Sequence, residues 1–252
     1  MILSLWNRAQ VVDIHTWFWL GAALLVLGMI FFTVMGLADG KGHENYFMTY
    51  FFITLMASTT YIAMALGLGR TTNADGVVFY YARYLDWMVT TPLLLLNLAM
   101  LATFNIGRRA PLVAGLLGLD VFMILTGLVA GLASGSAKWV FYFLSCLAFL
   151  AIVGIIWGVL RVEAARLTAE ESSVYNRATA IVTGVWTLYP VVWLIGTEGI
   201  GAIGLSGETM LYMILDVSAK IGLGCVLLNA VRKVVPRKIE DDLKDVLVPI
   251  SN

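Results

Sequence analysis

The sequence predicts an all-α membrane protein, a bundle of seven transmembrane helices, and three observations predict it. Of the 252 residues, 60% are hydrophobic and only 13% are charged, whereas about a quarter of the residues in soluble domains are charged. Seven apolar stretches have the length of roughly 20 residues that crosses a bilayer. The polar segments between them are short, so no second domain fits between the helices.

The predicted helices follow from the positions of the apolar stretches. In chain order they span residues 17–35, 46–67, 77–104, 111–132, 139–160, 178–195 and 209–231. The longest polar segment between them is residues 161–177. We expect residues 1–232 to form the seven-helix domain and residues 233–252 a short solvated tail. The N-terminal segment MILSLWNRAQ lacks the pattern of a removable signal peptide, so the first helix is expected to direct insertion.

Basic residues are distributed unequally between the two ends of the predicted helices. With the N-terminus outside, the outer side has only Arg8, Arg70 and Lys138. The inner side then has Lys41, Arg108, Arg109, Arg161, Arg166, Arg177, Arg232, Lys233, Arg237, Lys238 and Lys244. Because basic residues resist translocation, this asymmetry predicts a multi-pass protein of the cell membrane with a cytoplasmic C-terminus. The net charge of zero gives no reason to expect nucleic acid as a partner.

The two remaining basic residues, Arg83 and Lys220, lie inside predicted spans. A charge at mid-membrane costs about 2.5 to 3.5 kcal/mol, so it is usually paired and retained for a function. Lys220 follows Asp216 by four residues, which puts both on one side of the last helix. Arg83 and Asp86 are three residues apart in the third helix, and the two cations and two anions are expected to neutralise one another. The alternative is that they are only structural ion pairs between helices.

Further polar and aromatic residues are expected around these charges. Thr90 and Asn97 share the helix face of Asp86. The aromatic residues of the third and sixth helices at the same depth are Trp87, Trp186, Tyr189 and Trp193. An aromatic stripe alone is more often plain packing. With a buried lysine, whose amine can condense with an aldehyde to a Schiff base, it predicts a cofactor pocket.

Three segments resemble helices C, F and G of the microbial (type 1) rhodopsins: RYLDWMVTTPLLL (83–95), WTLYPVVWLIG (186–196) and LDVSAK (215–220). The resemblance covers nearly the whole chain, and residues 81–96 are most similar to the cyanobacterial rhodopsin and sensory rhodopsin group. It implies a seven-helix bundle with all-trans-retinal in the core, bound as a protonated Schiff base to Lys220. Asp86 would be the primary counterion and proton acceptor, Asp216 the second counterion, and Arg83 a mobile cation beneath them.

The same resemblance implies the remaining site residues. Those against the chromophore would be Trp87, Thr91, Leu94, Met123, Gly127, Tyr142, Ser145, Phe149, Trp186, Tyr189, Pro190 and Trp193. Tyr61 and Thr90 join the proton-transfer residues, and the buried acid Asp120 would support the pocket. Glu198 and Glu208 match the proton-release pair of bacteriorhodopsin-like pumps, although from the residues alone they would be solvated loop glutamates. No Cys or His spacing indicates a metal site.

The resemblance implies a light-driven outward proton pump rather than an enzyme, and one departure is important. Outward pumps typically have a carboxylic proton donor where this chain has Asn97, and Tyr50 replaces the threonine that holds it. The alternative is therefore a sensory rhodopsin that signals through a transducer. Neither His15 nor His43 is expected to be more than a surface residue. Expected partners are the lipid bilayer, protons and further copies of the chain, first as a trimer, and a carotenoid antenna stays open.

Overall fold

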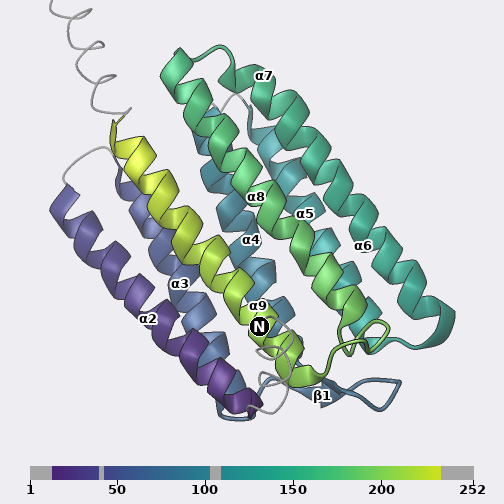
Figure 1. Cartoon of the computed structure of the whole chain (residues 1–252). Coiled ribbons are helices and arrows are strands. Elements are labelled where there is room, and N and C mark those ends of the chain that lie inside the picture. The colour runs from purple at the N-terminus through teal and green to yellow at the C-terminus, as the bar shows by residue number, and fades with distance from the viewer. Residues whose placement is uncertain (1–12, 40–42, 103–108, 234–252) are drawn as a thin grey trace, which may run out of the picture.

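The computed structural model describes residues 13–39, 43–102 and 109–233. Within these ranges seven helices are long and apolar enough to cross a membrane, which confirms the predicted fold class. They lie side by side in one bundle (Figure 1). Most of the predicted tail lies outside the described residues, as do Arg8, Lys41 and Arg108 among the basic residues counted for orientation.

The first four spans are α2 (Ile14–Asp39), α3 (Glu44–Ala65), α4 (Tyr81–Ala102) and α5 (Ala110–Leu132). The fifth consists of α6 (Gly135–Ile155), a π-helical turn η2 (Ile156–Leu160) and α7 (Arg161–Ala164). The sixth is α8 (Ala169–Ile195). The seventh begins as α9 (Leu205–Val217), passes through a second π-helical turn η3 (Ser218–Gly222) and continues to Lys233.

The prediction that the third helix begins at Val77 is wrong, because a β-hairpin occupies that position. Strands β1 (Thr71–Thr72) and β2 (Val78–Phe79) pair antiparallel before α4 begins. The Asn73 side chain holds the turn by accepting hydrogen bonds from the amides of Asp75 (3.1 Å) and Val77 (2.9 Å). Its amide nitrogen donates to the carbonyl of Gly131 (3.1 Å), which ties the hairpin to the end of α5.

The polar segment 161–177 was predicted to be a connecting loop, and most of it is helical instead. The fifth span continues to Ala164, and α8 begins at Ala169. A capping box starts α8: the Thr168 hydroxyl accepts from the amide of Glu171, and the Glu171 carboxylate accepts from the amide of Thr168. This T-x-x-E pattern marks the start of a helix. The prediction missed it because it considered only how polar the segment is.

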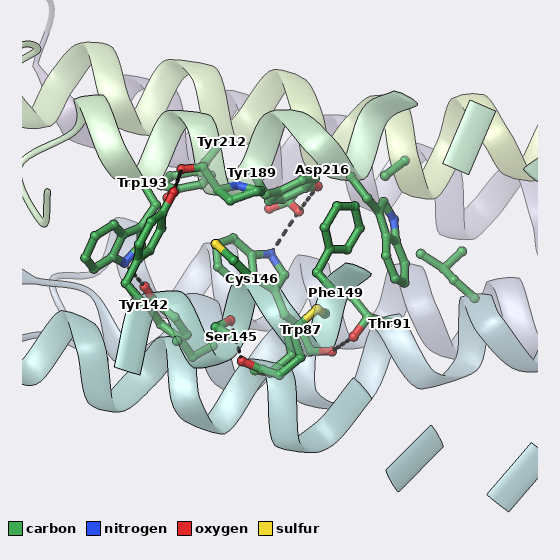
Figure 2. Close-up of a pocket in the computed structure, with 18 of the residues that line it drawn as sticks. Trp87, Thr91, Tyr142, Ser145, Cys146, Phe149, Tyr189, Trp193, Tyr212 and Asp216 are labelled. Carbon is green, nitrogen blue, oxygen red and sulfur yellow. Dashed lines mark hydrogen bonds between the residues drawn. The ribbon is translucent and has the colours of Figure 1, made fainter. Parts of the chain in front are cut away.

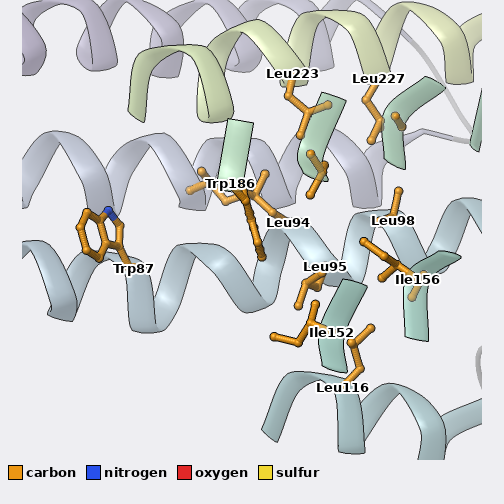
Figure 3. Packing of buried hydrophobic residues seen from close by; sticks show 14 of the residues in the cluster. Trp87, Leu94, Leu95, Leu98, Leu116, Ile152, Ile156, Trp186, Leu223 and Leu227 are labelled. Carbon is orange, nitrogen blue, oxygen red and sulfur yellow. The ribbon is translucent and has the colours of Figure 1, made fainter. Parts of the chain in front are cut away.

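The bundle places its polar side chains inside and many apolar ones outside. Leu27, Phe143 and Leu147 are about 60% exposed, at 61%, 60% and 61%, as expected for side chains that face lipid. A large apolar cluster runs through the bundle, and Figure 3 shows part of it in close-up. Its members include Leu95, Leu98, Ile152, Ile156 and Leu227. This apolar packing connects side chains of several spans inside the bundle.

Candidate functional site

Lys220 lies in the π-helical turn η3, where the last helix changes its hydrogen-bonding register. Such turns are frequent at functional sites. The side chain is only 1% exposed. Its Nζ lies 2.5 Å from Oδ2 of Asp86 and 2.9 Å from Oδ1 of Asp216. In this structure Nζ is a free amine and stands for the nitrogen that a bound aldehyde cofactor would share.

Asp216 receives hydrogen bonds from several helices. Oδ2 accepts from the Tyr61 hydroxyl (2.7 Å). Oδ1 accepts from the Tyr189 hydroxyl (2.9 Å) and from Nε1 of Trp87 (3.1 Å), as well as from Lys220. Hydrogen bonds to a carboxylate stabilise its negative charge. These hydrogen bonds therefore hold the Asp216 carboxylate in its ionised form and in one position.

Asp86 accepts fewer hydrogen bonds than Asp216 does. Oδ2 accepts from Lys220, whereas Oδ1 is buried and has no hydrogen-bond partner among the described residues. Thr90 does not bridge the site here, because its hydroxyl donates to the backbone carbonyl of Asp86 (2.9 Å). Asp86 thus has one oxygen on the Lys220 nitrogen and one free to bind a proton.

Arg83 does not pair with Asp86 or Asp216, which corrects the expected mutual neutralisation of two cations and two anions. Its guanidinium donates to Oε1 of Glu208 (2.8 Å) and to the hydroxyl of Thr209 (2.6 Å). It also lies 4.8 Å from the ring centroid of Tyr212. The buried charges therefore form two groups: Lys220 with Asp86 and Asp216, and separately Arg83 with Glu208.

Glu208 and Glu198 are buried, at 0% and 2% exposure, and not solvated loop side chains. Oε2 of Glu208 accepts from both the amide and the hydroxyl of Thr197, each at 2.7 Å. A Cβ on Gly196 would lie 2.7 Å from this oxygen, so the close approach requires glycine. Oε2 of Glu198 accepts from the Tyr84 hydroxyl (3.0 Å). Burial and the charge of Glu208 raise the pKa of Glu198 to about 8.

A cavity with about 790 Å³ of space between atoms, part of it open to solvent, lies beside Lys220. Figure 2 shows the labelled side chains that line it. All twelve residues predicted to lie against a chromophore line the cavity, together with Lys220 and Asp216. It is also lined by Tyr84, Ile124, Cys146, Tyr212 and Ala219, which the sequence did not predict as pocket residues.

Residues 13–234 match the family model described as bacteriorhodopsin-like protein. The chain belongs to this family. Bacteriorhodopsin of Haloterrigena sp. is 41% identical over 228 residues, 88% of this chain and 89% of the relative. Archaerhodopsin-2 of Halobacterium sp. is 40% identical over 221 residues, 85% of this chain and 83% of the relative.

Two solved structures have the same fold as this bacteriorhodopsin-like chain. The thermophilic rhodopsin from Rubrobacter xylanophilus has a TM-score of 0.86 at 38% identity, covering 88% of this chain and 97% of that one. A cyanorhodopsin from the cyanobacterium Calothrix sp. NIES-2098 has a TM-score of 0.83 at 34% identity, covering 88% of this chain and 96% of that one. These similarities confirm the predicted microbial rhodopsin family and, with it, retinal as the cofactor.

The cavity of this bacteriorhodopsin-like chain fits retinal. Its walls are largely apolar and aromatic, and Nζ of Lys220 is the one primary amine among the described residues that line it. The rings of Tyr142 and Trp193 stack at 4.5 Å and 18° in its wall. A Cβ on Gly127 would lie 3.4 Å from the Ser145 hydroxyl and from the Tyr84 ring, so a larger side chain would crowd this wall. The pocket therefore suits a flat apolar aldehyde.

The remaining predicted residues lie deeper in the bundle or at its end. The Thr91 hydroxyl donates to Asp120 (2.6 Å), consistent with a supporting position for this acid. Asn97 is fully buried, and neither its Oδ1 nor its Nδ2 has a partner within the described ranges. The expectation for His43 is wrong: it is 5% exposed and pairs with Asp39 at 2.5 Å, because the ends of α2 and α3 enclose it.

Proposed function

We propose that the protein is a light-driven outward proton pump in which Asp86 accepts the proton. The observation that supports this most is the inequality of the two carboxylates beside Lys220. Among the described residues, Asp216 accepts from four donors, whereas Asp86 accepts only from the Lys220 nitrogen and has one oxygen without a partner. When that nitrogen loses a proton, Asp86 is the carboxylate that binds it more favourably, because fewer hydrogen bonds stabilise its negative charge.

Retinal supplies a light-driven isomerisation and a protonated nitrogen at the Lys220 position. Side chains of the protein accept the proton and direct it outward. Asp216 keeps its charge because Tyr61, Tyr189 and Trp87 hold it. A proton moved from Nζ of Lys220 to Asp86 makes that carboxyl neutral, which removes one anion from the interior. The Arg83 guanidinium is then attracted less strongly toward Asp86 and more strongly toward Glu208 and Glu198 on its other side.

The exit route leads from Arg83 to Glu208 and Glu198. Arg83 already binds Glu208, and Glu198 holds its proton at neutral pH because burial raises its pKa to about 8. A shift of the Arg83 charge toward Glu198 would lower the proton affinity there, since Arg83 is the largest influence that lowers this pKa. Release against the membrane potential requires about 2.3 kcal/mol per proton per 100 mV.

We expect Glu198→Gln to abolish the prompt release of a proton after a flash. In the unmodified protein the prompt release should disappear as the pH rises through about 8, because Glu198 then has no proton to give in the dark. A pH-indicator dye in the medium measures both. Glu163→Gln, a glutamate in the distant α7, is the control and should keep the signal. Prompt release in Glu198→Gln equal to that of the control would contradict this role.

The return of the proton is expected to be slow, because Asn97 has no titratable proton. The decay of the light-induced deprotonated state should slow as the pH rises from 5 to 9, since the proton must come from water. Asn97→Asp should speed this decay by about 10²-fold, the lower end of what a positioned acid contributes. A decay rate independent of pH in the unmodified protein would contradict the prediction. Flash photolysis on the purified protein measures it.

The direction of pumping depends on the orientation of the bundle. Five described basic residues lie at or next to helix ends: Arg109 before α5, Arg161 and Arg166 at α7, and Arg232 and Lys233 at the end of the seventh span. These helix ends lie opposite the hairpin (Figure 1), and positive residues stay in the cytoplasm. The release glutamates then face outward. We further propose the cell membrane as the location and a homo-oligomer as the assembly.

A slow cycle also suits a photosensor that acts through a partner, and Asn97 is the observation that favours this second candidate. The two functions differ in one measurement. Cells that express the chain with all-trans-retinal should acidify an unbuffered suspension in the light, and an uncoupler should abolish the effect. Colour without any acidification would overturn the pump and favour the sensor.

A further inference from the structure

The inner half of the bundle contains buried polar atoms with open hydrogen-bonding capacity. From the level of Tyr61 and Asp86, Tyr50 on α3 and Asn97 on α4 are each eleven residues nearer the cytoplasmic end. At about 1.5 Å per residue, both lie roughly 16 Å from the Lys220 site. Thr179 on α8 lies ten residues inward from Tyr189, or about 15 Å.

These three residues form one layer, which we name the Asn97 layer. The Tyr50 hydroxyl and both polar atoms of Asn97 are buried without a hydrogen-bond partner among the described residues. The buried Thr179 hydroxyl lies near the Tyr175 hydroxyl but makes no hydrogen bond of good geometry among these residues. Buried polar groups in proteins are generally satisfied by ordered water when no protein group reaches them. The layer is therefore suited to hold water, yet none of its three side chains is an acid.

A titratable group lies beyond this layer on the same helix. His43 precedes Tyr50 by seven residues, which is about 10 Å along α3. Its Nδ1 lies 2.5 Å from Oδ2 of Asp39 at the end of α2. Arg232, at the end of the last helix, pairs with the other oxygen of Asp39. The other charged neighbours of His43 along the chain are Glu44 and Lys41, and Lys41 lies outside the described residues.

The chemistry of this pair leaves one ring nitrogen available. A carboxylate can only accept, so Nδ1 of His43 donates its proton to Asp39. Nε2 is then the position that gains and loses a proton, and it is buried with no partner in the described part of the chain. Histidine is the side chain that ordinarily changes charge between pH 5 and 8.

We propose that His43, oriented by Asp39, is the proton-uptake group that supplies the Asn97 layer. This inference rests on the proposed pump. Nε2 of His43 binds one proton from the cytoplasmic solution and becomes part of an imidazolium. It passes that proton through water in the Asn97 layer to the nitrogen at Lys220 and returns to neutral imidazole. One proton enters and none is left behind, and no oxidant or reductant takes part.

The test uses the full chain with retinal and compares His43→Gln with His15→Gln. These are the only two histidines in the sequence. His15 is a matched control, since its Nδ1 lies 2.9 Å from the carbonyl of Ala65 at the opposite end of the bundle. Flash photolysis at pH 5 to 9 measures the rate at which the nitrogen regains its proton. The rate in His43→Gln should fall on the order of tenfold or more, and added imidazole should restore it, whereas His15→Gln should match the unmodified protein.

A second readout does not depend on the stability of a variant. Isotope-labelled histidine in the unmodified chain should give a light-induced infrared difference band that rises and decays with the late step. The band should survive His15→Gln. Equal rates in both variants, or no histidine band, would overturn the inference. Failure of the unmodified protein to acidify the medium would instead overturn the pump, so the two failures are distinguishable.

Discussion

Asp86→Asn should abolish light-driven acidification while the protein still folds and binds retinal. Asparagine fills the same space but cannot accept the proton, and Asp216 is already held by Tyr61, Tyr189 and Trp87. We expect pumping to fall by at least about 10²-fold, the lower end of what a positioned proton acceptor contributes. The colour should also move to longer wavelength, because the nearest anion to the Lys220 nitrogen is lost.

Suspension acidification and an absorption spectrum measure these two effects. Asp120→Asn is the matched control, since Asp120 is another buried carboxyl, bound to Thr91 (2.6 Å), that has no ion pair with Lys220. It should pump normally. Asp86→Glu should keep part of the activity. Pumping by Asp86→Asn at the level of the Asp120 control would exclude Asp86 as the acceptor.

Lys220→Ala should remove the visible colour completely, because none of the other described residues that line the cavity has an amine. It should also destabilise the bundle, since it leaves Asp86 and Asp216 buried without their cation. Breaking a buried ion pair typically costs about 3–5 kcal/mol. Absorption after incubation with all-trans-retinal measures the first effect, and thermal unfolding measures the second.

The double variant Lys220→Ala with Asp86→Asn separates colour from stability. Removing one of the two anions should recover part of the lost stability, while the protein stays colourless. Lys138→Ala is the control for loss of a buried lysine, because Lys138 is 6% exposed and pairs with Asp75 rather than with the pocket. It should keep its colour. A visible retinal band in Lys220→Ala would contradict the assignment of the cofactor lysine.

The sequence predicted the seven spans well because apolar length is a strong local signal. It did not predict the β1–β2 hairpin, because each strand has only two residues, fewer than the four to eight that give a recognisable alternating pattern. The hydrogen bond that ties the hairpin to α5 joins Asn73 and Gly131, which are 58 positions apart. The helical start at Thr168 was missed for a different reason. Polar composition suggested a loop, although the capping signature was present.

The site was predicted largely through chemistry that is costly in a membrane. Lys220, Asp86 and Asp216 were conspicuous as charges within apolar helices. The pairing of Arg83 with Glu208 was not predictable, because it depends on how α4 and α9 approach one another. Burial of His43 was hidden for the same reason, since two helix ends and Arg232 enclose it. Ile124 and Cys146 gave no chemical signal at all.

The transfer from the Lys220 nitrogen to Asp86 is tested most directly by time-resolved infrared spectroscopy of the carboxyl region. A protonated carboxyl band should appear at the rate at which the nitrogen loses its proton. In Asp86→Glu this band should move to a different frequency, whereas in Asp216→Glu it should keep its position. A band that changes frequency in Asp216→Glu but not in Asp86→Glu would contradict Asp86 as the proton acceptor.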